Sequence, residues 1–187
     1  MRHLGPKKHQ TGLTLVELMV AIAIIGITAA VAIPNYFRQQ PFRQLNTTGR
    51  DIYANLQMAK LEAVRRNANV VMEFLPGSPF TSYHMFVDNG AGVGGVAGDG
   101  IWNGTEPRLI WPAVTLPQGV MGTHTFGVSN IIAFSSRGLP GGVGTVTLSI
   151  DADGNGVPDL IGGQAPFRTI TVTTAGAIRM GDNTGIR

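Results

Sequence analysis

The chain has 187 residues, with 26 glycines, no cysteine and a charged fraction of 13%. The absence of cysteine excludes a disulfide framework, a thiolate nucleophile and a cysteine-ligated metal. The length allows one modest domain with an appendage. The formal net charge is +3, but three of the basic residues, Arg2, Lys7 and Lys8, lie before the first apolar run. Without them, 11 Lys and Arg face 11 Asp and Glu, so the basic charge is weak evidence for nucleic-acid binding.

The first predicted element is an apolar run over residues 13–33 that contains one charged residue, Glu17. A helix of this length is about 30 Å long, which matches the hydrocarbon core of a bilayer. A cleaved secretory signal usually has a shorter apolar core, of about 7–15 residues. The basic residues before the run should stay in the cytoplasm, which places the rest of the chain across the membrane. We therefore expect a single transmembrane helix.

Glu17 stands out because a carboxylate in hydrocarbon is energetically unfavourable. Near the start of a helix, the lipid headgroups and the positive end of the helix dipole reduce that penalty. The acid is then simply tolerated at the membrane interface. Alternatively, the Glu17 carboxylate forms an ion pair with a positively charged group inside the membrane. Its position alone does not separate these two interpretations.

The residues around Glu17 resemble a known processing signature. The stretch "GLTLVE", residues 12–17, follows a short basic segment and opens the apolar run, which ends near Pro34. This combination closely resembles the prepilin-peptidase signature of type IV pilins and type II secretion pseudopilins. Members of that family more often have Phe where this chain has Leu13.

The resemblance implies a role for each matched residue. The prepilin peptidase would cut after Gly12 and release residues 1–12 as a leader peptide, and Leu13 would become the N-methylated mature N-terminus. Glu17 would pair with the N-terminal amine of a neighbouring pilin or pseudopilin, so that two buried charges compensate each other. Pro34 would be the helix-loosening proline of these proteins. Glu17 and Pro34 would therefore serve assembly, not catalysis.

The next predicted element is a second helical pattern that runs from Phe42 to about Asn67. Pro34 and Pro41 predict a loosened start to this part of the helix, because proline lacks the N–H that a helix needs. Its apolar positions recur at helical spacing: Leu45, Ile52, Leu56, Ala59 and Ala63. We expect one long helix. Its first half, residues 13–33, would lie in the membrane, and its second half, residues 34–68, would pack on a sheet.

The rest of the chain, residues 69–187, predicts a periplasmic β-rich domain. Strands are indicated at 69–75, 80–88, 130–136, 145–151 and 168–174, because turn residues bound these segments and several of them alternate apolar and polar residues. Residues 107–117 form a less regular strand pattern, because prolines interrupt it. The expected fold class is α+β, a long N-terminal helix packed on antiparallel β-sheets. This layout resembles the GspH/FimT branch of minor pseudopilins and minor pilins, in the stretches "LQMAKLEAVRRNANVVMEF", "IIAFSSRGLPGG" and "RTITVTTAGAIRM".

One loop offers a candidate metal site. In "DADGNGVPD", Asp151, Asp153 and Asn155 occupy positions one, three and five of a calcium-loop pattern, and Asp159 occupies position nine. Position twelve is Gly162 and not the bidentate Glu of an EF-hand, so any Ca²⁺ would bind weakly. The alternative is an Asp- and Gly-rich hairpin loop without a cation.

Basic residues near the C-terminus offer a candidate DNA site: Arg168, Arg179 and Arg187. The resemblance to FimT-type minor pilins implies DNA binding through a Gly-Arg-x-Arg motif, but this chain has Ala177 at the position of the first Arg. Phosphate contacts need several cations. The missing Arg and the balanced charge of residues 13–187 therefore argue against DNA as a partner.

No catalytic motif accompanies these features. The chain has no G-x-S-x-G elbow, no HExxH and no P-loop, and His84 lies in a strand pattern where histidine is usually structural. We expect a minor pilin-like structural subunit, not an enzyme, with no required cofactor. It would be anchored in the inner membrane and assemble into a type II secretion pseudopilus or a type IV pilus. The alternatives are a DNA-binding minor pilin and a plain membrane-anchored periplasmic domain that keeps residues 1–12.

Overall fold

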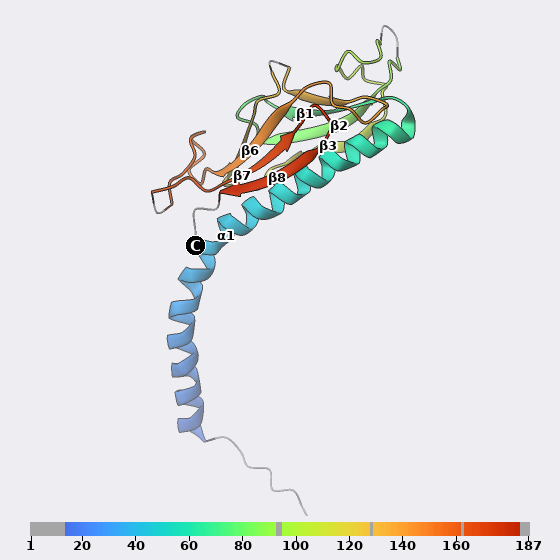
Figure 1. The fold of residues 1–187 in the computed structure, drawn as a ribbon. Helices are drawn as coiled ribbons and strands as arrows, with labels where there is room; N and C mark the ends of the chain where they lie inside the picture. The colour runs from blue at the N-terminus through green and yellow to red at the C-terminus, as the bar shows by residue number, and fades with distance from the viewer. Residues whose placement is uncertain (1–13, 93–94, 128, 162, 184–187) are drawn as a thin grey trace, which may run out of the picture. The chain divides into compact units, whose positions relative to one another are not determined.

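The structure is a computed structural model that describes residues 14–92, 95–127, 129–161 and 163–183 (Figure 1). Its single described helix, α1, spans Leu15–Arg66 and contains 52 residues. The chain divides into two compact units, Met1–Gln39 and Gln40–Arg187. Each unit is described by itself below.

Helix α1 begins directly after Thr14, whose hydroxyl accepts a hydrogen bond from the backbone N–H of Glu17 at 3.2 Å. Such a side-chain acceptor satisfies one of the free N–H groups of the first turn. The helix continues through Pro34 and Pro41. Each proline removes one backbone donor, but the helix is unbroken over residues 35–40, where we expected a loosened segment.

Eight strands follow the helix in the described residues. They are β1 Asn69–Leu75, β2 Ser82–Asp88, β3 Arg108–Thr115, β4 Val120–His124, β5 Ile131–Phe134, β6 Gly144–Ile150, β7 Phe167–Val172 and β8 Ile178–Asn183. They form two four-stranded antiparallel sheets, with orders β3-β2-β1-β5 and β4-β6-β7-β8. The α+β architecture is therefore as expected from the sequence.

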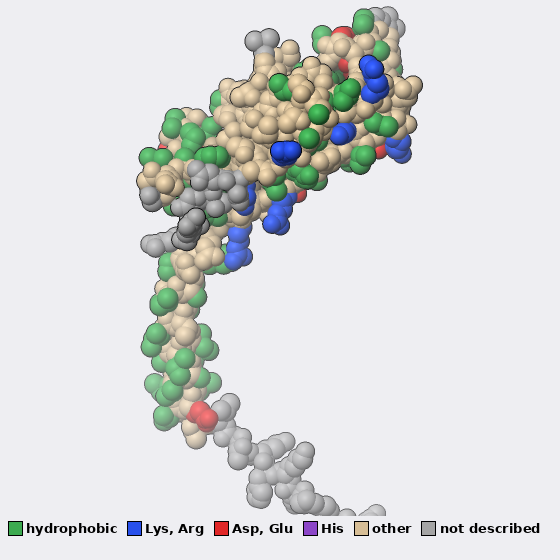
Figure 2. Space-filling model, in the orientation of Figure 1, with side chains coloured by type: hydrophobic (Ala, Val, Ile, Leu, Met, Phe, Trp, Pro, Cys, Tyr) green, Lys and Arg blue, Asp and Glu red, His purple; other side chains and the backbone are tan. Residues whose placement is uncertain are grey.

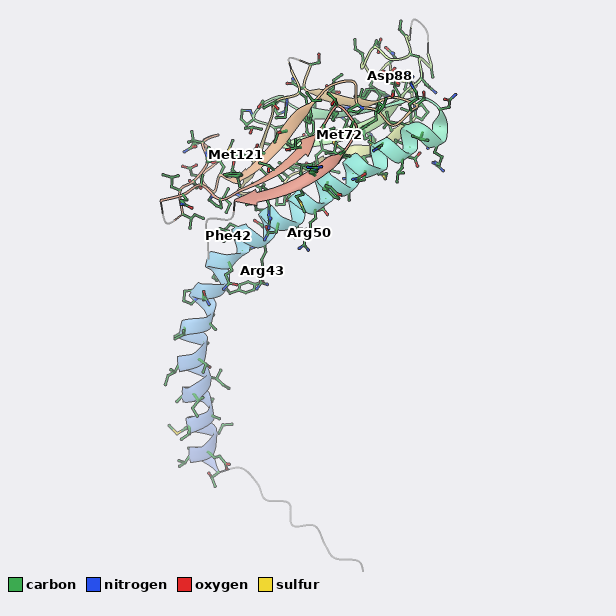
Figure 3. The ribbon with its side chains drawn as sticks, viewed as in Figure 1. Phe42, Arg43, Arg50, Met72, Asp88 and Met121 are labelled. Carbon is green, nitrogen blue, oxygen red and sulfur yellow. The ribbon has the colours of Figure 1, made fainter. Side chains whose placement is uncertain are left out.

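The core of the second unit forms between α1 and the strands. The five predicted apolar positions of the helix are all buried: Leu45, Ile52, Leu56, Ala59 and Ala63. Alternate residues of β1, including Met72, pack against them, as do alternate residues of β2, including Met85. Arg50, in contrast, extends from α1 away from the strands (Figure 3). The helix is therefore amphipathic here, and burial of its apolar stripe holds it on the sheets.

Three polar contacts fix the helix against strands that are distant in sequence. Asn55 Nδ2 donates to Tyr83 Oη of β2 at 2.8 Å. Lys60 Nζ donates to the carbonyl of Gly176, which precedes β8, at 2.8 Å. At the start of β7, Arg168 Nε donates to the side-chain oxygen of Asn46 at 2.7 Å. These bonds orient one helix over both sheets.

Most predicted strands match the structure closely. The first one, at residues 69–75, is confirmed as β1, and the irregular pattern at 107–117 is confirmed as β3. The structure adds β4 and β8, which we did not expect. Both are short and contain a glycine, Gly122 or Gly181, so neither shows a clear alternation of apolar and polar residues.

Candidate functional site

The N-terminal half of α1 presents a continuous apolar surface. Its large hydrophobic side chains, such as Leu15, Ile25 and Val31, are more than half exposed. Figure 2 shows these side chains along the helix, with one acidic group near its start. By length and composition, α1 is apolar enough to cross a membrane. This surface is consistent with membrane anchoring, because such an apolar face is otherwise unfavourable in water.

The acidic group is Glu17, in the first turn of α1. Thr14, as N-cap, and Glu17, three residues later, match the capping-box pattern, in which Gln can replace Glu. The negative charge also interacts favourably with the helix dipole. In a capping box, Glu17 would support helix initiation through its shape and hydrogen bonding, which Gln shares, whereas its interaction with the dipole needs the charge. The predicted processing residues Gly12 and Leu13 lie outside the described residues.

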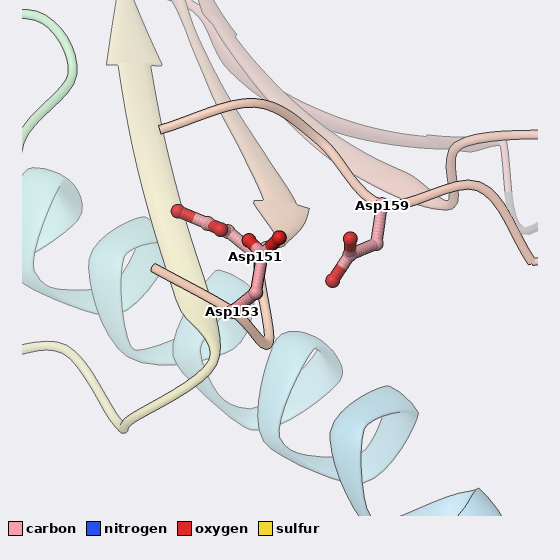
Figure 4. Close-up of side chains that lie close together, drawn as sticks. All are labelled: Asp151, Asp153 and Asp159. Carbon is pink, nitrogen blue, oxygen red and sulfur yellow. The ribbon is translucent and has the colours of Figure 1, made fainter. Parts of the chain in front are cut away.

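The predicted calcium loop brings three acids together between β6 and β7 (Figure 4). One carboxylate oxygen from each of Asp151, Asp153 and Asp159 lies within 4.8 Å of the other two. The backbone N–H groups of Asn155 and Gly156 donate to the two oxygens of Asp151 at 3.1 and 3.0 Å.

The other polar groups of this loop are also hydrogen-bonded. Asp159 accepts from the backbone N–H of Ala152 at 2.6 Å, and Asp153 accepts from Asn155 Nδ2 at 2.7 Å. The side-chain oxygen of Asn155 accepts from the N–H of Val157 at 2.7 Å. Donors from the loop itself therefore compensate the clustered negative charge, as in Asx turns. These hydrogen bonds are those expected of an Asp- and Gly-rich hairpin loop that holds its own carboxylates. Gly162 lies outside the described residues.

The structure does not bring the predicted DNA-binding arginines together. In the β7–β8 ladder, Arg168 pairs with Asp182 and Arg179 pairs with Thr171. Since Arg168 and Thr171 are three residues apart on one strand, the two arginines face opposite sides of the sheet. Arg168 is also bonded to Asn46 on α1. Arg187 lies outside the described residues.

Two histidines, His84 and His124, contact neighbouring side chains of the sheets. His84 Nε2 lies 3.0 Å from Glu73 Oε2, directly across the β1–β2 pair. The ring of His124 stacks against Phe74, with centroids 5.3 Å apart, and against Phe126 at 6.0 Å. Burial lowers the pKa of His124 below its usual value of 6.5.

An aromatic stack that no sequence pattern predicted lies beside β3. The guanidinium carbon of Arg108 lies 3.8 Å from the ring centroid of Trp102 and 3.6 Å from that of Trp111. Trp111 is 53% exposed. The sequence offers a signal, since two tryptophans and an arginine lie within ten positions. However, their stacking depends on how the β2–β3 connection folds back, which no local pattern reveals.

Comparisons with known proteins agree with this architecture. Residues 7–33 match the model of the prokaryotic N-terminal methylation motif. The structure of the minor pseudopilin EpsH from the type 2 secretion system of Vibrio cholerae has a similar fold, with a TM-score of 0.51, 11% identity and coverage of 74% of this chain and 97% of that one. At this identity the likeness shows the fold alone.

Two curated relatives match the N-terminal part of the chain. The type IV major fimbrial protein FimA of Dichelobacter nodosus is 51% identical over 47 residues, which is 23% of this chain and 30% of FimA. The pilin-like protein PilA1 of Thermus thermophilus is 37% identical over 82 residues, 43% of this chain and 49% of PilA1. The chain thus spans less than half of the length of these relatives.

Together, the methylation motif and the helix-and-sheet fold define a pilin-like protein. Residues 48–176 match the model of the type II transport protein GspH. The chain belongs to this GspH family, whose fold is that of structural pilin and pseudopilin subunits.

Proposed function

We propose that this protein is a minor pilin-like structural subunit that assembles into a filament through the N-terminal half of α1. The observation that carries the proposal is a single carboxylate, Glu17, in the first turn of an exposed apolar helix. In a filament, neighbouring subunits would cover this apolar surface. The charge of Glu17 would pair with the N-terminal amine of a neighbour. Any other alignment of neighbouring subunits would leave a buried charge unpaired and would therefore be unfavourable.

Processing and topology follow from the same proposal. The prepilin peptidase cuts after Gly12, and Leu13 becomes the N-methylated N-terminus. The basic leader starts on the cytoplasmic side of the inner membrane, and the β-rich unit lies in the periplasm. The subunit then initiates or caps a type II secretion pseudopilus or a type IV pilus. Its role is mechanical and not enzymatic.

The two alternatives gain no support from the described geometry. A DNA-binding minor pilin needs several cations on one surface, whereas Arg168 and Arg179 face opposite sides of their sheet. A plain membrane-anchored domain explains the apolar helix but leaves the match of residues 7–33 to the methylation motif unexplained.

The proposal is tested by expressing the chain with and without a prepilin peptidase, in a host that assembles the cognate filament. Mass spectrometry of the recovered protein should show loss of residues 1–12 and a methyl group on Leu13. Sheared and purified filaments should contain the mature protein. A chain that keeps residues 1–12 in the presence of the peptidase, and is absent from filaments, would instead be a plain membrane-anchored domain.

A further inference from the structure

A pocket of about 440 Å³ lies on the face of the first sheet that is turned away from the core. Glu73 and His84 contribute to its floor from β1 and β2, and Asp99, Ile101 and Trp102 contribute from the β2–β3 connection. A second hollow of about 280 Å³ adjoins it and shares Asp99. The two together form an elongated depression that is large enough for more than one side chain.

The side of the pocket formed by the β2–β3 connection is held by two buried carboxylates. Asp88, which is 1% exposed, accepts from the backbone N–H groups of Gly98 and Gly100 at 2.7 and 2.8 Å. Glu106, which is 3% exposed, accepts from the N–H of Gly90 at 3.0 Å. It also accepts from the N–H of Asn103 at 3.2 Å. Charge-assisted hydrogen bonds of this kind are strong, so they fix the backbone of the connection at Gly90, Gly98, Gly100 and Asn103.

The polar groups that line the pocket are predominantly acceptors. Glu73 and Asp99 offer carboxylates, although one oxygen of Asp99 also accepts from the N–H of Ile101 at 2.9 Å. None of the described residues that line the pocket is a Lys or Arg. His84 Nε2 faces the carboxylate of Glu73 and therefore donates its proton there, while the buried Nδ1 is sealed from solvent. The indole N–H of Trp102 is likewise engaged, with the carbonyl of Glu106 at 3.3 Å. Ser129 also lines the pocket, and its hydroxyl can donate or accept, so it is the two carboxylates that favour a ligand with donors.

The electrostatic environment selects the same kind of ligand. Asp88 and Glu106 lie behind the β2–β3 connection, so four acids surround the site. The opposing positive charge is Arg108, whose guanidinium is stacked against Trp102 and Trp111 and does not line the pocket. Anionic ligands such as phosphates are disfavoured here, and a cation is favoured.

We propose that this pocket binds an arginine side chain from a partner protein. An arginine has an apolar stem and a planar head with five donors and no acceptor. The stem would pack against Ile101 and Ile131, the guanidinium would bond Glu73 and Asp99, and its plane would lie against the indole of Trp102. Arginine fits better than lysine because its planar head suits both carboxylates and an aromatic ring. The adjoining hollow would take the residues beside it.

The test uses the full chain in micelles of a non-ionic detergent and two short peptides, Ac-Gly-Arg-Gly-NH2 and Ac-Gly-citrulline-Gly-NH2. Citrulline has the shape of arginine without its charge. The chain has two tryptophans, so NMR resolves two indole N–H signals. We expect the arginine peptide, at up to about 10 mM, to shift the signal of Trp102 more than that of Trp111. The citrulline peptide should bind at least about tenfold more weakly.

Matched variants locate the binding site on the chain. Glu73→Gln and Asp99→Asn keep the shape of each side chain and should each weaken arginine binding about three- to tenfold. Glu62→Gln removes the same charge from the ion pairs of α1 with Arg65 and Arg66 and should leave binding unchanged. Equal binding of both peptides, no binding of either, or the same loss in all three variants would overturn the proposal.

Discussion

Asn55 on α1 and Tyr83 on β2 are joined by a hydrogen bond of 2.8 Å between the amide nitrogen and the phenol oxygen. The two residues are 28 positions apart, and Tyr83 is 1% exposed. The bond therefore lies at the packed interface of helix and sheet. The bond orients α1 on the sheet. It also gives the buried Tyr83 hydroxyl a partner, and burial of that hydroxyl without a partner would be unfavourable.

Tyr83→Phe removes this bond and leaves the amide of Asn55 without its partner. We expect the free energy of unfolding of the segment Gln40–Arg187 to fall by about 1 kcal/mol, measured by urea denaturation with an unchanged m-value. Tyr53→Phe is the matched control, because the Tyr53 hydroxyl accepts from Gln57 on the same helix, at 3.2 Å, and not from a strand residue in the described part of the chain. It should change the free energy by less than about 0.5 kcal/mol. Equal effects of the two variants would contradict the role of the Asn55 contact.

The same residue predicts a pH dependence. Burial raises the pKa of Tyr83 above its usual value of 10, a nearby Asp51 carboxylate adds to the shift, and the Asn55 bond opposes it. A raised folded-state pKa means that the unfolded chain releases this proton first, so stability is complete below pH 10 and is lost as pH rises beyond it. Tyr83→Phe should therefore flatten the loss of stability above about pH 10. An unchanged alkaline slope in that variant would assign the slope to other groups.

The fold was predictable where one local pattern decides the structure. The buried stripe of α1, from Leu45 to Ala63, follows helical spacing, and β1 is an apolar run from Val70 to Leu75 that only Glu73 interrupts. In contrast, β4 and β8 form because neighbouring strands offer free edges, not because their own residues favour strands. Local propensity is a weak guide in such cases.

The candidate sites divide in the same way. The chemistry of Glu17 is local to one helical turn, so the sequence identifies it. The pocket beside Trp102 depends on the pairing of Glu73 with His84 and on the loop held by Asp88 and Glu106. These contacts join positions that no short motif connects. The positions of Arg168 and Arg179 also depend on pairing between strands. The β7–β8 register offsets them by an odd number of residues, so they lie on opposite faces of the sheet.

The loop of Asp151, Asp153 and Asp159 makes a distinct prediction about calcium. A loop with a dissociation constant of about 1 mM would gain about 1.4 kcal/mol at 10 mM CaCl2, or roughly 3–6 °C in melting temperature. Because the loop amides already satisfy the carboxylates, we expect a shift below about 1 °C. The control is MgCl2 at the same concentration. A larger shift with CaCl2 alone, lost in Asp153→Ala, would establish a calcium loop.

The position of the arginines predicts weak DNA binding. We expect the segment Gln40–Arg187 to show no measurable affinity for a double-stranded oligonucleotide at 150 mM NaCl, and Arg179→Ala to change nothing, because this arginine faces away from Arg168. The measurement is fluorescence anisotropy at about 50 and 150 mM NaCl. Binding that weakens steeply with salt and is lost in Arg179→Ala would favour the DNA-binding alternative.

The central claim is that the charge of Glu17, and not its local cap, drives assembly. Three variants separate these roles. Glu17→Gln keeps a capping-box residue but removes the charge, Glu17→Ala removes both, and Thr14→Ala removes the hydroxyl that caps the helix at 3.2 Å while it keeps the charge. All three should insert in the membrane, because the apolar run is unchanged.

The most direct measurement is the amount of each variant in sheared, purified filaments, relative to its amount in the membrane. The charge-pair account predicts that Glu17→Gln is depleted as strongly as Glu17→Ala, by about tenfold or more, while Thr14→Ala assembles normally. Normal recovery of Glu17→Gln, together with loss of Thr14→Ala, would show that Glu17 acts through the first turn of its own helix and would contradict the account.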